Sequence, residues 1–298
     1  MAQQPQLPRR VVVKLGTNVI MRSDGRVALG LVCGLVESIA ALREDGVEFL
    51  VVSSGSIGLG MERLGLAARP TDLARIQACA ATGQSRLMSI YEDAFDRLGC
   101  RTAQVLLTED DFRSPTRHAN LARTLAALLS MGVIPVINEN DTVSVAELDA
   151  PAPESAREKL FGDNDKLSAL VATHVGAELL VLLSDVDGLF DRLPGEPGAR
   201  LLHEVPAIDA SILSLAHGGN GRGRGGMLSK LEAALLAQEA GLSVVIANGR
   251  TPQVLEQVVA GRAGVGTRFP AREAVRSGLE AGPAEISGAA GTGAGARR

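Results

Sequence analysis

Two lysines stand beside glycines at positions where a cation and backbone amides can meet one anion. Lys14 lies near the end of a short apolar run and precedes Gly16, and Lys230 follows a Gly-rich segment at the expected start of a helix. Ammonium groups neutralise phosphate charge, and amides at turns and helix N-termini bind anions. Taken singly, Lys14 also fits the close of an edge strand, and Lys230 a solvated first helical turn. Together they favour a polyanion site.

Carboxylates and amides gather in two clusters. Residues 138–142 (Asn-Glu-Asn-Asp-Thr) directly follow the apolar run 133–137, and residues 162–166 (Gly-Asp-Asn-Asp-Lys) come about a score of residues later. A β-branched run of this length is typical of a buried strand, and ligands bind beyond the carboxyl ends of strands in open α/β sheets. We therefore expect the first cluster to lie at a ligand mouth.

Two more strand ends carry polar residues. The segment 53–58 (Ser-Ser-Gly-Ser-Ile-Gly) is a small-residue turn that fits either a cradle for phosphate or carboxylate oxygens or close packing of a helix on a strand. Ser184 and Asp185 end a third run and suit a ribose, a purine edge or hydrated Mg²⁺, whereas Asp187 with Gly188 also fits a simple turn. The chain has neither a P-loop nor a Rossmann glycine pattern after its first strand.

Phosphoryl transfer is the chemistry that these motifs favour. It needs positioning and charge neutralisation more than covalent help from the protein. Two lysines, three small-residue turns and the two acidic clusters provide such groups, so we infer nucleotide-dependent phosphoryl transfer.

The elements that must position these residues alternate along the chain. Apolar runs of strand length separate longer helical patterns, which is typical of βαβ units and a mostly parallel sheet. The expected strands are 11–15, 48–53, 102–107, 133–137, 179–184 and 243–247, and the expected helices are 29–43, 71–97, 116–130, 165–175, 227–240 and 251–260. We expect a flexible terminus at 1–10, a domain over 11–270, a loop at 148–157, a mobile Gly-rich segment at 217–226, and a disordered Gly/Ala-rich tail at 271–298.

Composition excludes several other classes. The net charge is −4 with scattered basic residues, and aromatic residues make up only 2%, so nucleic acid is not an expected partner. The three cysteines and four histidines lack metal-ligand spacing, and no apolar stretch is long enough for a membrane span. We expect a reduced cytoplasmic protein without a permanent protein-held metal.

The chain resembles the amino acid kinase family over about residues 11–269. The resemblance rests on VVVKLGTNVI, SSGSIGLG, GQSRL, LLT, PVINENDTV, GDNDKLSAL and GGMLSK, in that family's order and spacing. Paired INENDTV and GDND resemble the members that phosphorylate the γ-carboxylate of L-glutamate. The resemblance implies a three-layer αβα sandwich with a substrate side and, from about residue 165, a nucleotide side. It implies ATP, Mg²⁺ and L-glutamate as ligands, and a first step of proline synthesis.

The resemblance also assigns residues. Lys14 and Lys230 would contact the transferring phosphate and Asp165 would organise them. Substrate would be held by Ser54, Asp141, Asn164 and Asp163. The nucleotide would meet Lys14, Gly16, Ser184, Asp185, Arg224, Gly225, Gly226, Met227, Leu228, Ser229 and Lys230.

Several features depart from the family pattern or extend it. Ser184 replaces a usual Thr, Arg224 and Leu228 replace usual small hydroxyl residues, and the loop 146–161 is longer than usual. Related bacterial chains continue into a PUA domain, and because few residues follow Phe269 we do not expect one here. The family also implies proline as feedback inhibitor, a glutamyl phosphate reductase as partner and a homo-oligomer. The alternatives are another carboxylate or carbamate acceptor, or a non-catalytic amino acid or nucleotide sensor.

Overall fold

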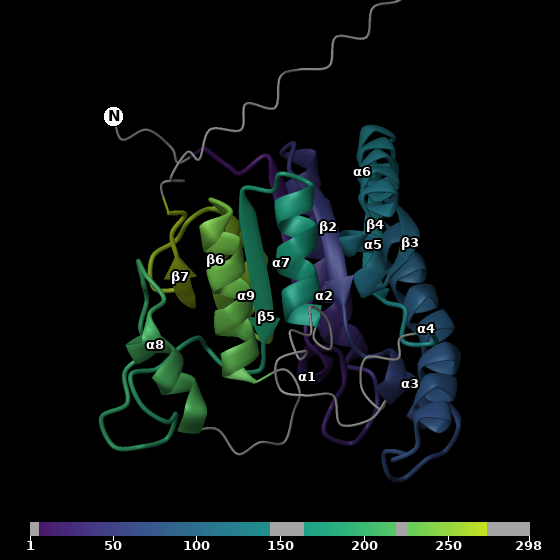
Figure 1. The fold of residues 1–298 in the computed structure, drawn as a ribbon, viewed down its shortest axis with the longest axis horizontal. Coiled ribbons are helices and arrows are strands. Elements are labelled where there is room, and N and C mark those ends of the chain that lie inside the picture. The colour runs from purple at the N-terminus through teal and green to yellow at the C-terminus, as the bar shows by residue number, and fades with distance from the viewer. Residues whose placement is uncertain (1–5, 144–163, 219–225, 273–298) are drawn as a thin grey trace, which may run out of the picture.

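The computed structural model describes residues 6–143, 164–218 and 226–272 (Figure 1). The expected loop at 148–157 and the tail from 273 onward lie outside these residues, as do most of the Gly-rich segment and the first five residues of the chain. The candidate site residues Asp163, Arg224 and Gly225 also lie outside them.

A seven-stranded sheet forms the centre of the described chain, in the order β3-β4-β2-β1-β5-β6-β7. All neighbouring strands are parallel except β7, which is antiparallel to β6. The strands are β1 (Arg10–Leu15), β2 (Glu48–Ser53), β3 (Arg101–Leu107), β4 (Val133–Glu139), β5 (Leu179–Ser184), β6 (Ser243–Asn248) and β7 (Thr267–Phe269). Because β1 is central, the interpretation of Lys14 as the close of an edge strand is wrong.

Helices cover both faces of the sheet, which gives the expected three-layer sandwich. One face packs against α2 (Leu29–Glu44), α4 (Leu73–Asp96) and α10 (Val254–Val259). The other packs against α6 (Pro115–Ser130), α7 (Asn164–His174) and α9 (Met227–Glu239), and α7 and α9 lie in front of the sheet in Figure 1. Side chains alternate between the two faces along each strand. The core is built mainly from Val, Leu, Ile and Ala, as the scarcity of aromatic residues predicts.

The six expected strands and six expected helices are confirmed, with small shifts at their ends. The prediction missed α3 (Ser56–Arg63), because its glycines break the apolar spacing and the segment resembles a turn. Gly55 does adopt a left-handed conformation, with φ 105°, but it is the residue from which α3 begins. Short elements were also missed: α1 (Thr17–Ile20), α5 (Glu109–Arg113), α8 (Ala210–Ser214), the 3₁₀ helix η2 (Leu215–Gly218) and β7.

Candidate active site

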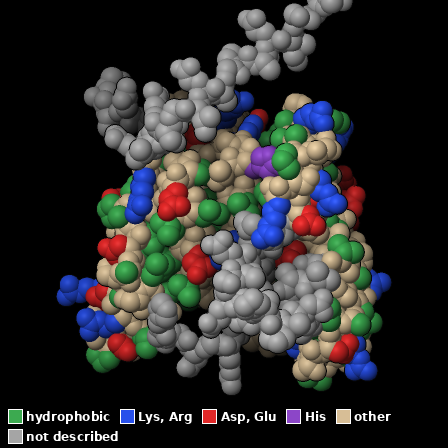
Figure 2. Space-filling view, viewed as in Figure 1, with side chains coloured by type: hydrophobic (Ala, Val, Ile, Leu, Met, Phe, Trp, Pro, Cys, Tyr) green, Lys and Arg blue, Asp and Glu red, His purple; other side chains and the backbone are tan. Residues whose placement is uncertain are grey.

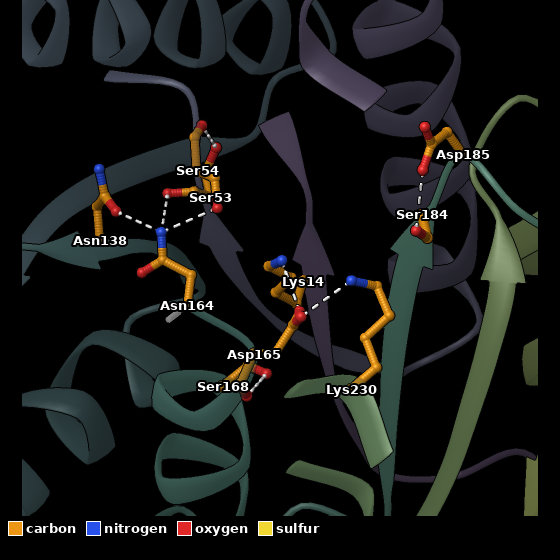
Figure 3. A network of polar contacts seen from close by, with 10 residues as sticks. All are labelled: Lys14, Ser53, Ser54, Asn138, Asn164, Asp165, Ser168, Ser184, Asp185 and Lys230. Atoms are coloured by element: carbon orange, nitrogen blue, oxygen red, sulfur yellow. Dashed lines mark hydrogen bonds and ion pairs between the residues drawn. The ribbon is translucent and has the colours of Figure 1, made fainter. Parts of the chain in front are cut away.

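The two lysines meet one carboxylate at the carboxyl end of the sheet. Lys14 shares a strand face with Val12, which packs on the α7 and α9 side, so its side chain points toward those helices. Asp165 lies in the first turn of α7 and Lys230 in the first turn of α9. Asp165 contacts Lys14 Nζ at 2.5 Å and Lys230 Nζ at 3.0 Å (Figure 3).

This group is almost entirely removed from solvent. Asp165 is 0% exposed, Lys14 3% and Lys230 4%. Burial by itself would raise the pKa of Asp165, but the two lysine charges and their hydrogen bonds outweigh it and hold that pKa below its usual value. A solvated Lys230 is therefore the wrong interpretation. The group carries two cations and one anion, so it has a net positive charge to offer an anionic ligand.

Ser54 and Asn164 meet beside this charged group. Asn164 Nδ2 donates to Ser54 Oγ at 2.9 Å, joining the end of β2 to the start of α7 (Figure 3). The structure thus brings two of the expected substrate residues together.

Asp141 lies after β4 and joins the turn that follows β2. Ser56 Oγ donates to Asp141 Oδ2 at 3.1 Å. Burial raises the pKa of Asp141, and the Ser56 hydrogen bond and the positive charge of Arg69 oppose that rise only in part. A half-buried carboxylate with one hydroxyl donor remains able to accept from a ligand cation. Ser56 was not among the predicted site residues, although its motif was.

The end of β5 carries the expected nucleotide residues. Ser184 Oγ donates to Asp185 Oδ1 at 3.3 Å, and Asn18 Nδ2 donates to Asp185 Oδ2 at 2.9 Å. Asn18 was missed as a partner of this carboxylate. Asp187 accepts from Asn248 Nδ2 at 2.8 Å, so its carboxylate ties β6 to the turn after β5.

The start of α9 supplies the other described nucleotide candidates. Gly226 is the N-cap residue of α9, and Met227, Leu228 and Ser229 form its first turn ahead of Lys230. Met227 packs partly against the core of the α7 and α9 face. Backbone amides at the start of a helix are suited to phosphate oxygens.

Gly16 does not offer its amide to a ligand as expected. Its N–H donates to the carbonyl of Leu183 at 3.3 Å, which ties the β1 turn to β5. A Cβ at this position would lie 3.7 Å from Lys14 Nζ, an ordinary van der Waals distance, so the packing beside Lys14 does not itself require glycine.

Two residues support Asn164: Asn138, which was expected at the ligand mouth, and Gln84, which was not predicted as a site residue. Asn138 Oδ1 accepts from Asn164 Nδ2 at 3.0 Å, and Asn138 Nδ2 donates to Gln84 Oε1 at 2.8 Å. Gln84 belongs to the GQSRL motif, which carried the resemblance but was given no role. A polar residue beside a glycine on a helix that faces the sheet was the available signal.

The surface charge, the acidic side chains and the helices of the described residues concern three expectations: nucleic acid, a protein-held metal and a membrane span. On the face shown in Figure 2, Lys and Arg side chains are interspersed with Asp and Glu. Among residues 6–143, 164–218 and 226–272, no group of three or more His, Cys, Asp or Glu side chains is arranged to hold a metal. None of the helices within these ranges is both long and apolar enough to cross a membrane.

The amino-acid sequence of the chain is similar to that of known proteins. The pattern described as "Amino acid kinase family" matches residues 9–248. A glutamate 5-kinase of Gloeobacter violaceus is 47% identical over 261 residues, covering 87% of this chain and 68% of that protein. One from Lactiplantibacillus plantarum is 43% identical over 263 residues, covering 88% of this chain and 96% of that protein.

Solved structures share the fold at low sequence identity. A carbamate kinase from Giardia lamblia bound to AMP-PNP superposes with a TM-score of 0.61 at 17% identity, covering 89% of this chain and 99% of that one. An isopentenyl phosphate kinase gives a TM-score of 0.58 at 19% identity, covering 87% and 100%. At these identities the likeness concerns the fold alone.

Proposed function

The chain belongs to the amino acid kinase family, and on that premise we propose that it transfers the γ-phosphoryl group of ATP to the γ-carboxylate of L-glutamate. The products are L-glutamyl 5-phosphate and ADP, and the reaction is the first step of proline biosynthesis. The observation that carries the proposal is the buried contact of Asp165 with Lys14 and Lys230. The two relatives described above, both named glutamate 5-kinase, support the choice of acceptor.

The chemistry needs no general base. A glutamate γ-carboxylate has an unperturbed pKa of about 4.3 and is ionised at neutral pH. One of its oxygens attacks the γ-phosphorus of ATP, a new O–P bond forms, and the bond to the β-phosphate oxygen breaks with its electron pair leaving on ADP. Lys14 and Lys230 neutralise charge on the phosphoryl oxygens, and Asp165 orients both ammonium groups.

The substrate residues divide by charge. Asp141 is a half-buried carboxylate suited to the substrate ammonium, and we assign Asp163 to the same end of the ligand. Ser54 offers a hydroxyl to a carboxylate, and we assign Asn164 to the substrate through its Oδ1, because its Nδ2 already donates to Ser54 and Asn138. A zwitterionic acceptor therefore finds complementary groups on both sides of the pocket.

The nucleotide residues are proposed at the other side of the charged group. Ser184 and Asp185 are assigned to the nucleoside, and the segment Arg224 to Lys230 to the phosphates. Mg²⁺ in phosphoryl-transfer sites is held largely by the substrate phosphates with one or two carboxylates. We therefore propose that the ion arrives with ATP, where it neutralises part of the triphosphate charge.

Partners and location are proposed from the family. We propose a cytoplasmic homo-oligomer that is inhibited by proline and that passes its labile product to a glutamyl phosphate reductase. Sedimentation, proline titration of the initial rate, and coupled turnover with such a reductase test these points separately.

The acceptor is tested by trapping the acyl phosphate as a hydroxamate. The protein is incubated with MgATP, hydroxylamine and one acceptor at a time: L-glutamate, L-aspartate, N-acetyl-L-glutamate or carbamate. We expect a hydroxamate with L-glutamate and ADP formation that depends on it. A hydroxamate with another acceptor alone favours a different member of the family. If none of the acceptors gives a hydroxamate or ADP, the result favours a non-catalytic sensor.

A further inference from the structure

Helix α4 packs unusually closely on helix α3, which follows β2. A Cβ added at Gly83 would lie 1.7 Å from the carbonyl oxygen of Ser56, and one added at Gly60 would lie 1.8 Å from the carbonyl oxygen of Cys79. Helices α3 and α4 therefore pack backbone against backbone. This approach brings side chains of α4 within reach of the ends of β2 and β4.

Two side chains of α4 form hydrogen bonds with residues at these strand ends. Gln84 bonds Asn138 at the end of β4, and Tyr91, two helical turns later, bonds Ser53 at the end of β2 at 2.9 Å. Because residues seven apart share one helix face, Gln84 and Tyr91 lie on the face of α4 that is turned toward the ends of β2 and β4.

The polarity of the hydrogen bonds around Asn138 follows from the backbone. The N–H of Glu139 donates to Asn138 Oδ1 at 2.8 Å, and a backbone N–H can only donate. The acceptor end of the Asn138 amide is thereby fixed, so its Nδ2 faces Gln84 Oε1. Asn138 is only 2% exposed, so leaving this Nδ2 without an acceptor is costly.

The same polarity extends to Ser54. Since Asn138 Oδ1 is an acceptor, Asn164 must present Nδ2 to it, and that Nδ2 also donates to Ser54 Oγ at 2.9 Å. An amide nitrogen cannot accept, so the Ser54 oxygen is the acceptor in this bond. The hydroxyl hydrogen of Ser54 is consequently directed away from Asn164. Ser54 is half-buried, so that hydrogen is available to a ligand.

We propose that Gln84 and Asn138 are positioning residues that orient the Asn164 amide and thereby make Ser54 a hydrogen-bond donor to the α-carboxylate of the acceptor. This inference rests on the proposed function, because it names the part of the acceptor that Ser54 contacts. We call the hydrogen-bonded series Gln84, Asn138, Asn164 and Ser54 the relay. It explains why a zwitterionic acceptor binds in one orientation: Ser54 contacts its carboxylate, and Asp141 is left for its ammonium group.

The first test is the variant Gln84→Met, which keeps length and helix propensity but removes the acceptor. We expect the KM for L-glutamate to rise on the order of tenfold, with kcat and the KM for MgATP within about twofold of wild type. Gln84→Glu retains an oxygen that accepts from Asn138, so it keeps most of the affinity. Ser85→Ala is the matched control, because Ser85 is exposed on the same helix and its hydroxyl bonds the carbonyl of Thr82.

A double-mutant cycle tests whether Gln84 acts through Ser54. Gln84→Met should have no further effect on the KM in a Ser54→Ala background. With 4-aminobutanoate, which lacks the α-carboxylate, Gln84→Met should leave binding unchanged in a thermal-shift titration. Additive effects, equal losses with both ligands, or a lower melting temperature without a change in KM would overturn the relay. Gln84→Lys, which also lacks an acceptor, replaces Gln84→Met if that variant does not fold.

Failure of the relay is distinguishable from failure of the proposed function. If the wild type forms no glutamyl hydroxamate but phosphorylates another acceptor, the proposed function is wrong. The same variants are then compared on that acceptor and on its analogue without the α-carboxylate. If Gln84→Met lowers the ratio of the affinity for the acceptor to the affinity for its analogue, the result supports the positioning role of Gln84. An unchanged ratio refutes it.

Discussion

Replacing Asp165 by Asn separates the charge of this residue from its shape. The variant leaves two ammonium groups, 3% and 4% exposed, without the carboxylate that lies 2.5 Å and 3.0 Å from them. Removing one partner from a buried ion pair costs about 3–5 kcal/mol, and the Asn oxygen offsets part of this by accepting from one lysine. We therefore expect a loss of about 3 kcal/mol in the free energy of unfolding.

A second ion pair between the same two helices is the matched control. Lys166 on α7 bonds Glu232 on α9 at 3.0 Å, with side chains 34% and 42% exposed. Exposed pairs contribute about 0–1 kcal/mol, so Glu232→Gln should leave the melting temperature nearly unchanged. For Asp165→Asn the expected loss in the free energy of unfolding corresponds to a decrease in melting temperature of roughly 6–12 °C.

The assay is thermal unfolding with and without MgATP, beside initial rates. Because the triphosphate supplies the missing negative charge, MgATP should raise the melting temperature of Asp165→Asn more than that of wild type, while turnover falls steeply. The lowered pKa of Asp165 means that its contribution is present above about pH 4 and is lost as pH falls through the lowered value, so the stability difference should be constant from pH 8 to 5. Equal stability of Asp165→Asn and Glu232→Gln would refute the reasoning.

Four further outcomes follow from the described contacts. Lys14→Ala should lower kcat by roughly 10²–10³ and also lower the melting temperature, because it removes one partner from the same buried group, measured by initial rates and thermal unfolding. Asp141→Ala should raise the KM for L-glutamate more than the KM for ATP, and the reverse pattern would show the substrate site to be misplaced. Because the pKa of Asp141 is raised, glutamate binding to the wild type should weaken at a higher pH than it would with an exposed aspartate. Burial, and then the charge of His118, lowers the pKa of His174, so folding stability should fall as pH drops below about 6.5, and His174→Gln should lose less melting temperature between pH 7.5 and 5.5. Gly83→Ala should destabilise the fold by about 3 kcal/mol, because its Cβ would lie 1.7 Å from Ser56 O, and an unchanged melting temperature would refute that packing.

Local sequence patterns predicted the strands and helices of this fold better than the side-chain contacts between distant residues. The run 11–15 predicted β1, and strand alternation explains why Lys14 points toward α7 and α9. The meeting of Lys14 with Asp165 was expected from the family resemblance, since no local pattern links residues so far apart in the chain.

Contacts that depend on tertiary packing could not be predicted. The bond between Gln84 and Asn138 requires α4 to pack closely on α3, and that approach depends on Gly60 and Gly83. The amide of Gly16 was expected to meet an anion because the sequence does not reveal that the carbonyl of Leu183 accepts from it.

The central claim is that an oxygen of the acceptor carboxylate itself attacks the γ-phosphorus of ATP. The most direct measurement uses L-glutamate labelled with ¹⁸O in its γ-carboxylate, with MgATP and hydroxylamine, followed by mass analysis of the phosphate released. Hydroxylamine attacks the acyl carbon, so the bridging oxygen leaves with phosphorus. We predict one ¹⁸O atom in the phosphate for each hydroxamate formed, and phosphate carrying only unlabelled oxygen would contradict the account.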